Sequence, residues 1–241
     1  MAAAEDFQPE SLAVTVARDG LARLRPAAMA AALQLPAATL GAFAASWERL
    51  ETDGFMADGG RYRLRRHANF TAAPGQPAIR GLHRPHYQAS VHNSLNGGLD
   101  RWFAPVEDSV AASPATAALL AMGGEAAAAL RPGAGFFIEM HQFRIEAMAG
   151  APGYPTPEGT HHDGVDIVLI AMVNRRNLTG GQTLVTDNAG RELARFTLDG
   201  LLDAAFMDDA RVMHGVTPIE PTDPSQPSRR DVLVITWKAL G

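Results

Sequence analysis

The stretch THHDGVDIVLI, residues 160–170, joins metal-ligating residue types directly to an apolar run. In an extended segment alternate side chains point to the same side, so His161 and Asp163 share one face and His162 points to the other. The apolar run that follows is typical of a buried strand. We therefore expect one imidazole and one carboxylate to meet at the start of a core strand.

A third ligand of the same kind lies further along the chain, in the strand-like segment RVMHGV, residues 211–216. Antiparallel pairing of this segment with the first would bring His214 beside His161 and Asp163. Two histidines and one carboxylate form the facial triad of non-haem Fe(II) oxygenases, which leaves positions open for a cosubstrate and for O2. The alternative is a histidine-rich loop that only caps a buried strand.

The rest of the C-terminal part alternates between strand-like segments and turn residues. Further strands are expected at residues 136–147, 165–174, 182–186, 195–198, 204–208, 211–216 and 231–238. Because Gly, Pro, Asn and Asp separate them, they favour an antiparallel sandwich or barrel over alternating βαβ units. One helix interrupts this part, with Ser113 as its cap, Pro114 at its first position and an alanine-rich body to Met122. Residues 221–228 form a polar, proline-rich loop.

The first 60 residues have a different pattern, a short hairpin followed by helices. Leu12, Val14 and Val16 alternate before a turn at residues 19–20, which predicts a strand and its return. Pro26 and Pro36 stand where helices begin. We expect one domain overall, in which residues 1–60 pack on a core formed by residues 61–241.

Composition limits the classes of function. The chain has 241 residues, a net charge of −5 and no cysteine. A disulfide scaffold, a cysteine nucleophile and a thiolate metal site are therefore excluded, and any metal must be held by His, Asp or Glu. The acidic balance gives no general attraction to nucleic acid or to an anionic membrane, so a small-molecule partner is expected. No segment has the features of a leader or a membrane span, which predicts a cytoplasmic protein, and the oligomeric state stays open.

Two arginines open the last predicted strand, in RRDVLVITW, residues 229–237. A guanidinium at this place can hold the distal carboxylate of a ligand whose other end chelates the iron. Alternation allows only one of the two to face inward, and we favour Arg230 over Arg229. The alternative for either arginine is a surface salt bridge.

With these residues in place the sequence resembles a family. It is similar to the bacterial Fe(II)/2-oxoglutarate-dependent dioxygenases related to L-isoleucine 4-hydroxylase, a group that includes proteins associated with biofilm formation and stress. The resemblance rests on blocks in a fixed order: WERL (47–50), RYRLRR (61–66), YQ (87–88), HQFR (141–144), PEGTHHDG (157–164), HGVTPI (214–219) and RDVLV (230–234). Blocks in this order are more specific than any one motif.

The resemblance implies a double-stranded β-helix, the jelly-roll barrel of cupin-like enzymes, with flanking helices and the metal inside its mouth. It implies that His161, Asp163 and His214 hold Fe(II) and that Arg230 binds 2-oxoglutarate as cosubstrate beside O2. The implied reaction is hydroxylation of an unactivated C–H bond, in a free L-amino acid. Two other functions stay open: a non-catalytic metal- or 2-oxoglutarate-binding regulator, and a hydroxylase of peptide or protein side chains.

Substrate-binding residues are expected among polar residues on otherwise apolar strands. Gln142 and Arg144 share one face of the strand 136–147, and Arg144 could bind the substrate carboxylate. A structural ion pair of this arginine is the alternative. Gln88 and Asn93 are further candidates for the pocket lining, although ordinary turn hydrogen bonds explain such residues as well.

One basic patch has no place in this scheme. Arg61, Arg63 and Arg65 alternate, and Arg66 follows them. The patch could bind an anion or a nucleic acid. We favour a solvated or salt-bridged strand, because the protein is acidic and has no second basic cluster.

Overall fold

The computed structural model describes residues 9–56, 59–91, 95 and 97–240. In this part of the chain the large sheet has eight strands: β1 (Leu21–Leu24), β2 (Glu51–Thr52), β3 (Arg63–Ala72), β4 (Ile79–Arg80), β5 (Phe136–Ala147), β6 (Ile167–Arg176), β10 (Ala204–Asp208) and β13 (Ser228–Ala239). Their order is β1-β10-β6-β13-β5-β3-β2, and β4 pairs with β3. All neighbours are antiparallel, as the sequence pattern predicts.

Two smaller sheets face the large one. The first has the order β11-β8-β9, from β8 (Gln182–Asp187), β9 (Glu192–Thr197) and β11 (Val212–Val216). The second pairs β7 (Leu178–Gly180) with β12 (Ile219–Pro221). Chain connections cross repeatedly between the large and the small sheets, which is the arrangement of a jelly roll and confirms the expected mainly β fold with flanking helices.

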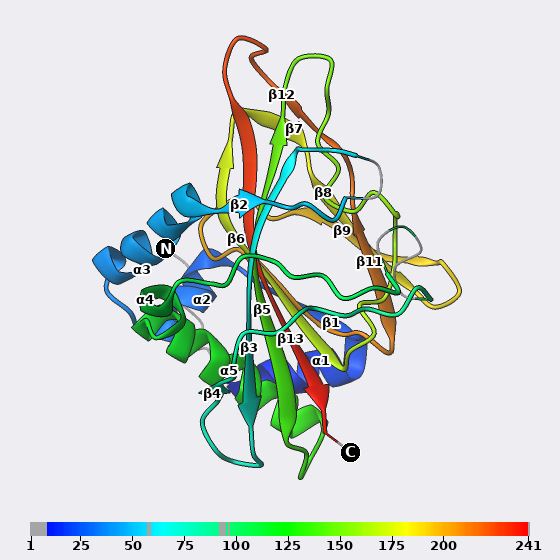
Figure 1. The fold of residues 1–241 in the computed structure, drawn as a ribbon. Helices are drawn as coiled ribbons and strands as arrows, with labels where there is room; N and C mark the ends of the chain where they lie inside the picture. Colours follow the sequence, from blue (N-terminus) through cyan, green and yellow to red (C-terminus); the bar gives the residue numbers. More distant parts are fainter. Residues whose placement is uncertain (1–8, 57–58, 92–94, 96, 241) are drawn as a thin grey trace.

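The helices lie on the other side of the large sheet (Figure 1). They are α1 (Pro9–Asp19), α2 (Pro26–Leu33), α3 (Ala37–Ala45), α4 (Asp108–Ala111) and α5 (Pro114–Leu130), with a 3-10 turn η1 (Ser46–Arg49). The cap of α5 is as expected, since the Ser113 hydroxyl accepts the Thr116 N–H at 3.2 Å and Pro114 begins the helix. The helix continues past Met122 to Leu130. Its alanine-rich body packs closely on Trp237 of β13.

The N-terminal segment corrects one expectation. Residues 9–19 form the helix α1 and not a strand. Leu12 and Val16, one helical turn apart, are both buried, whereas Val14 is exposed. The strand follows the turn at Gly20 as β1, which pairs with β10 and so becomes part of the large sheet. The first 60 residues therefore supply strands to the large sheet as well as helices that pack on it.

The two central strands of the large sheet separate the helices from a cavity. Side chains at even positions of β5, such as Ile138 and Met140, belong to the core under the helices, as do those at odd positions of β13. The opposite positions of both strands line the cavity on the other face. Because both faces of β5 and β13 are covered, these strands carry buried polar residues on both sides.

Among the described residues no single helix is long and apolar enough to cross a membrane; α2 and the following helical segment to Arg49 meet the length and composition only as a pair, which is bent by 106°.

Candidate metal centre

A cavity of about 450 Å³ lies between the large sheet and the three-stranded sheet. Alternate residues of β5 and β13, paired across the sheet, form its floor: Phe137 with Lys238, Glu139 with Thr236, His141 with Val234, Phe143 with Val232 and Ile145 with Arg230. His161, Asp163 and His214 line the same cavity. The expected metal ligands and the expected cosubstrate arginine thus face one space.

The two histidines meet through backbone pairing. His161 and His214 form an antiparallel bridge in which each N–H donates to the other's C=O at 3.0 Å. Asp163 lies between the rings: its carboxylate oxygens are 3.5 Å from His161 Nε2 and 3.8 Å from His214 Nε2. The three side chains offer ligand atoms that all lie within 4.8 Å of one another. Two imidazoles and a carboxylate at this separation fit a single Fe(II) ion bound on one side.

Burial and the charges of the three side chains on one another shift the pKa values of His161, Asp163 and His214. Burial lowers the pKa of His161, but the hydrogen bond and charge of Asp163, together with Glu158, outweigh it and raise the pKa to about 9. Burial would raise the pKa of Asp163, but His161 and His214 hold it well below its ordinary value. Burial lowers the pKa of His214 to about 4. Metal binding to this group would displace the proton of His161, because an imidazole must be neutral to bind a metal ion.

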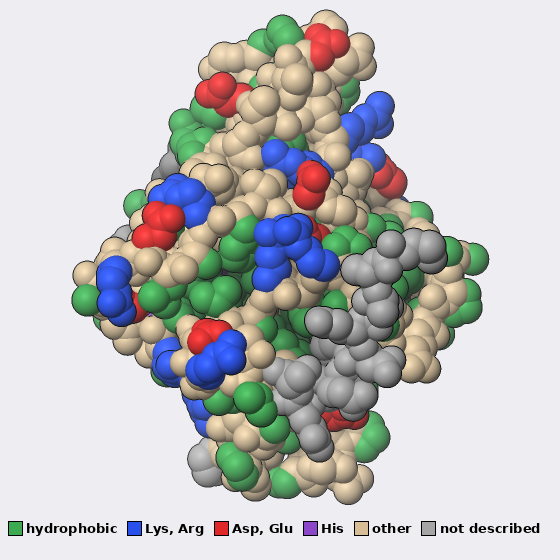
Figure 2. All heavy atoms as spheres, turned by 180° about the vertical axis from the view of Figure 1, so that it is seen from behind, with side chains coloured by type: hydrophobic (Ala, Val, Ile, Leu, Met, Phe, Trp, Pro, Cys, Tyr) green, Lys and Arg blue, Asp and Glu red, His purple; other side chains and the backbone are tan. Residues whose placement is uncertain are grey.

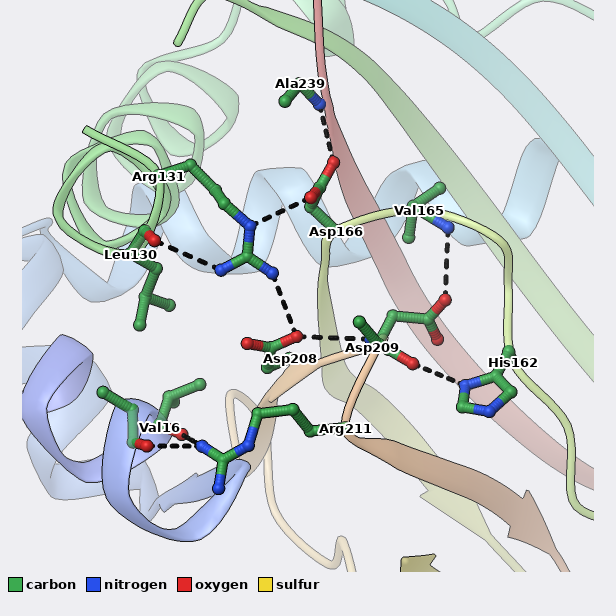
Figure 3. A network of polar contacts seen from close by, with 12 residues as sticks. Val16, Leu130, Arg131, His162, Val165, Asp166, Asp208, Asp209, Arg211 and Ala239 are labelled. Carbon is green, nitrogen blue, oxygen red and sulfur yellow. Dashed lines mark hydrogen bonds and ion pairs between the residues drawn. The ribbon is translucent and has the colours of Figure 1, made fainter. Parts of the chain in front are cut away.

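The loop that carries the first two ligands is fixed from outside the cavity. The Asp209 carboxylate accepts the backbone N–H groups of Asp163, Gly164 and Val165 at 3.0, 2.8 and 3.1 Å. His162 points away from the metal ligands and contacts the Asp209 carbonyl through Nδ1. Figure 3 shows the contacts of Asp209 with Val165 and His162, together with the ion pairs of Arg131 with Asp166 and Asp208 nearby.

The inner side of the ligand set is held as well. His161 Nδ1 lies 3.1 Å from the Gly159 carbonyl, which leaves Nε2 for the metal, and 3.5 Å from the Glu158 carboxylate. Gln88 lines the cavity and its Nε2 donates to the Asp163 carbonyl at 3.1 Å. Partners of this kind fix the orientation of metal ligands and support their affinity.

Arg230 faces the cavity and Arg229 does not. Arg230 is only 2% exposed, and its Nε and Nη2 have no hydrogen-bond partner among the described residues. Burial, with the charge of Arg175, lowers its pKa to about 10. Arg229 lies on the opposite side of β13 and pairs with Glu48 at 2.7 Å. The cavity thus contains a buried cation that lacks an anion, in the position expected for the cosubstrate residue.

The other expected substrate residues are placed differently. Arg144 and Gln142 share a face of β5, but this face points to the helices, which corrects the expected direction. Arg144 makes two hydrogen bonds with Asp231, at 2.7 and 2.9 Å, and Gln142 donates to the Ser46 hydroxyl at 2.8 Å. Neither side chain lines the cavity. Asn93 lies outside the described residues.

A second group of ligand-type residues was not anticipated. It consists of His67, His86, Glu139 and His141, whose ligand atoms also lie within 4.8 Å of one another. Glu139 Oε1 lies 2.8 Å from His67 Nε2 and 2.9 Å from His86 Nδ1. Glu139 and His141 are two residues apart on β5 and therefore share a face, which the sequence could have indicated. Their partners, however, come from β3 and from a loop.

This second group is a poor cation site. The Arg65 guanidinium lies 3.0 Å from His141 Nδ1, so a positive charge already occupies one side of the group. Burial lowers the pKa of His86 to about 4 and that of His141 well below its ordinary value, and the positive charges of Arg65 and Arg101 act in the same direction on both rings. The group at His161, Asp163 and His214 has no guanidinium against its ligand atoms among the described residues and is the better candidate for iron.

The four arginines of the basic patch are only partly placed as expected from the sequence. Arg63 and Arg65 are buried and line the cavity, whereas Arg61 is exposed. Arg66 makes contacts on the opposite face of β3, to the Arg49 and Pro105 carbonyls and to Glu51. On the face seen in Figure 2, basic side chains lie in small separate groups, and the described residues form no continuous basic stripe there. The expected solvated or salt-bridged strand thus describes Arg61, which is exposed, and Arg63 and Arg66, which pair with Asp53 and Glu51. It does not describe Arg65, which is buried and lies 4.0 Å from the Asp53 carboxylate.

Comparisons with known proteins agree with this site. The family model described as 2OG-Fe dioxygenase matches residues 44–236. A curated relative, the 3(1)-hydroxy-L-isoleucine 4-dioxygenase of Pantoea ananatis (strain AJ13355), is 32% identical over 103 residues; this match spans 42% of the chain and only 41% of the relative.

Solved structures share the fold. A bsmA homologue from Methylobium petroleophilum PM1 is 36% identical, with a TM-score of 0.88 over 97% of this chain and 94% of that one. IDO from Bacillus thuringiensis has a TM-score of 0.81 at 19% identity, over 97% and 100% of the two chains. With the family model across most of its length, the chain belongs to the 2OG-Fe dioxygenase family, which works with Fe(II), 2-oxoglutarate and O2.

Proposed function

We propose that the protein is an Fe(II)- and 2-oxoglutarate-dependent hydroxylase of a free L-amino acid. One observation carries the proposal: a convergent set of two imidazoles and a carboxylate shares a cavity with a buried arginine that has no ion-pair partner among the described residues. His161, Asp163 and His214 hold Fe(II), and Arg230 binds the distal carboxylate of 2-oxoglutarate.

When bound, Fe(II) supplies the redox chemistry that couples decarboxylation of 2-oxoglutarate to succinate and CO2 with transfer of one oxygen atom of O2 into a C–H bond. The chain's own residues bind and orient the reactants. Asp209 and Gln88 fix the loop of Asp163, so the ligand set is in place before the reactants arrive. Apolar side chains such as Val232 and Val234 line the floor and keep water from the reacting groups.

Three features support an amino acid as the substrate. The cavity volume lies in the range of small-molecule sites. Glu158 lies beside His161, and its Oε2 is buried without a partner, which suits a ligand ammonium. The relative from Pantoea ananatis is named for oxidation of an isoleucine derivative.

The test is a turnover assay across the twenty L-amino acids. Purified protein is supplied with Fe(II), ascorbate and 2-oxoglutarate, and both succinate and a product heavier by one oxygen are measured. We expect coupled turnover with an aliphatic side chain such as that of isoleucine, leucine or methionine. If iron and 2-oxoglutarate bind but no amino acid raises succinate above the uncoupled background, the substrate is a peptide or the protein is a regulator without turnover.

A further inference from the structure

Besides Arg230, the cavity is lined by Arg63, which pairs with Asp53, by the exposed Arg84 and Lys238, and by two buried arginines, Arg65 and Arg101. Arg65 comes from β3, and Arg101 from the segment that pairs with His86. They are 5% and 2% exposed. Burying a guanidinium away from water is costly unless charge and hydrogen bonds compensate for it, so the partners of these two residues decide what they do.

Neither guanidinium has a carboxylate of its own. The closest carboxylate oxygen to Arg65 is Asp53 Oδ2 at 4.0 Å, and that oxygen already contacts Arg63 at 2.7 Å. Arg101 forms no ion pair among the described residues; its Nη2 donates to Gln88 Oε1 over 3.4 Å. The Nε atoms of Arg65 and Arg101 are both buried and have no hydrogen-bond partner within the described ranges.

The protein holds the two cations close together on one aromatic ring. Their Cζ atoms lie 3.8 and 5.6 Å from the centre of the Phe103 ring, and Phe143 covers Arg65 at 4.4 Å. Burial lowers the pKa of both arginines, and their mutual repulsion acts in the same direction on Arg65. Two neighbouring guanidinium groups that both have N–H groups without an acceptor favour the binding of an anion.

The pair also lies next to the metal ligands. Gln88 connects them, since it accepts from Arg101 and donates to the carbonyl of Asp163. A carboxylate bound by the arginines would hold the rest of its molecule within the cavity that contains the candidate iron ligands. The cosubstrate does not need this place, because one of its carboxylates goes to Arg230 and the other end to the metal.

We propose that Arg65 and Arg101 bind the free carboxylate of the substrate. This inference rests on the proposed function and sharpens it, because a residue inside a protein chain has no such carboxylate. The substrate class becomes free amino acids or other small acids, in preference to an apolar side chain inside a protein chain. The basic patch noticed in the sequence thus has a role, through Arg65, as half of a carboxylate clamp.

The experiment compares acids with their carboxamides. Binding is measured by calorimetry, without O2, to protein loaded with Fe(II) and 2-oxoglutarate. The ligands are the twenty L-amino acids, their N-acetyl derivatives and the matching carboxamides. For wild-type protein we expect at least one acid to bind and its carboxamide to bind at least about 30-fold more weakly, since the amide lacks the charge that the arginines need.

Variants assign this preference to the two residues. Arg65→Gln and Arg101→Gln should each weaken acid binding about 30-fold or more and reduce the preference over the amide, while the affinity for 2-oxoglutarate stays at the wild-type level. Arg101→Lys should restore part of the acid binding. Arg61→Gln, which removes an exposed charge from the same basic patch, should change neither affinity.

Several outcomes would overturn the inference. They are equal binding of acid and amide by wild-type protein, unchanged acid binding by both Gln variants, and the absence of any binding acid although 2-oxoglutarate binds. Loss of 2-oxoglutarate binding in the Gln variants would assign the pair to the cosubstrate instead. If a Gln variant does not fold, the wild-type comparison and Arg101→Lys still decide. Failure of the proposed function looks different: no binding of Fe(II) and 2-oxoglutarate, or a bound acid that is never oxidised.

Discussion

Replacement of Arg230 by glutamine tests the cosubstrate site, because it should lower the affinity of the protein for 2-oxoglutarate. The wild-type guanidinium is almost fully buried, and its Nε and Nη2 have no hydrogen-bond partner in the part of the chain that the structure describes. A carboxylate entering the cavity would therefore receive two charge-assisted hydrogen bonds in a place shielded from water. Glutamine is shorter and neutral, so it can replace at most one of these bonds and none of the charge.

The size of the effect follows from this geometry. Removing one partner of a buried, hydrogen-bonded ion pair costs about 2 to 5 kcal/mol. Because glutamine retains some hydrogen bonding, we expect about 2 to 4 kcal/mol, which corresponds to a loss of affinity on the order of 30- to 1,000-fold. The folded state should not suffer, since Arg230 is an unpaired buried charge and its removal relieves a desolvation cost.

The assay is calorimetric titration of 2-oxoglutarate into protein loaded with Fe(II) in the absence of O2. Arg229→Gln is the matched control, because its side chain lies on the other face of β13 and pairs with Glu48. Its affinity for 2-oxoglutarate should equal that of the wild type. A normal affinity in Arg230→Gln, or a loss of affinity in Arg229→Gln, would refute the assignment of the inward arginine.

Three further predictions concern separate parts of the molecule. His162→Ala should keep the iron affinity in a competition titration, because the ring points away from the ligand set; loss of iron would contradict this. Folding lowers the pKa of His86 from 6.5 to about 4, so the unfolded chain takes up this proton first and the free energy of unfolding should fall by about 3 kcal/mol between pH 6.5 and pH 4. In His86→Gln, urea denaturation should show this fall reduced, and an unchanged fall would count against it. Gly123→Ala should destabilise the protein by about 1 to 3 kcal/mol, because the new Cβ would lie 2.3 Å from Trp237, whereas Gly124→Ala meets no atom closer than 4.0 Å and should not destabilise it; equal melting temperatures would contradict this.

The sequence predicted side-chain directions correctly within clearly marked strands, where alternate side chains point to opposite faces. The range expected for β5 is the observed one, and alternation separates His161 from His162 and Arg230 from Arg229 as the structure does. These results follow from local geometry alone, since neighbouring side chains of an extended segment must point to opposite sides.

The sequence was less informative where the packing of elements against one another determines which face of a strand lines the cavity or whether a segment is a helix. Both faces of β5 are buried, one under the helices and one in the cavity, so alternation groups Gln142 with Arg144 but does not say which face they share. In the N-terminal segment Leu12, Val14 and Val16 fit a strand, while Leu12 and Val16 also fit a helical turn, and packing selects the helix.

The burial of Arg65 could not be predicted from the sequence for the same reason. A run of arginines in an acidic protein usually faces solvent, and only the tertiary structure places Arg65 between Phe103 and Phe143 at the cavity. The cluster around Glu139 was missed for a related reason, since its members come from β3, β5 and a loop that are far apart in the sequence.

The position of the iron is the most important point to test, because two groups of ligand-type residues lie at or beside the cavity. Crystals grown without O2 in Fe(II) and 2-oxoglutarate, measured on both sides of the iron absorption edge, would locate the ion from its anomalous scattering. We expect a single strong peak among His161, Asp163 and His214, with the distal carboxylate of 2-oxoglutarate on Arg230. A peak among His67, His86, Glu139 and His141 would contradict it.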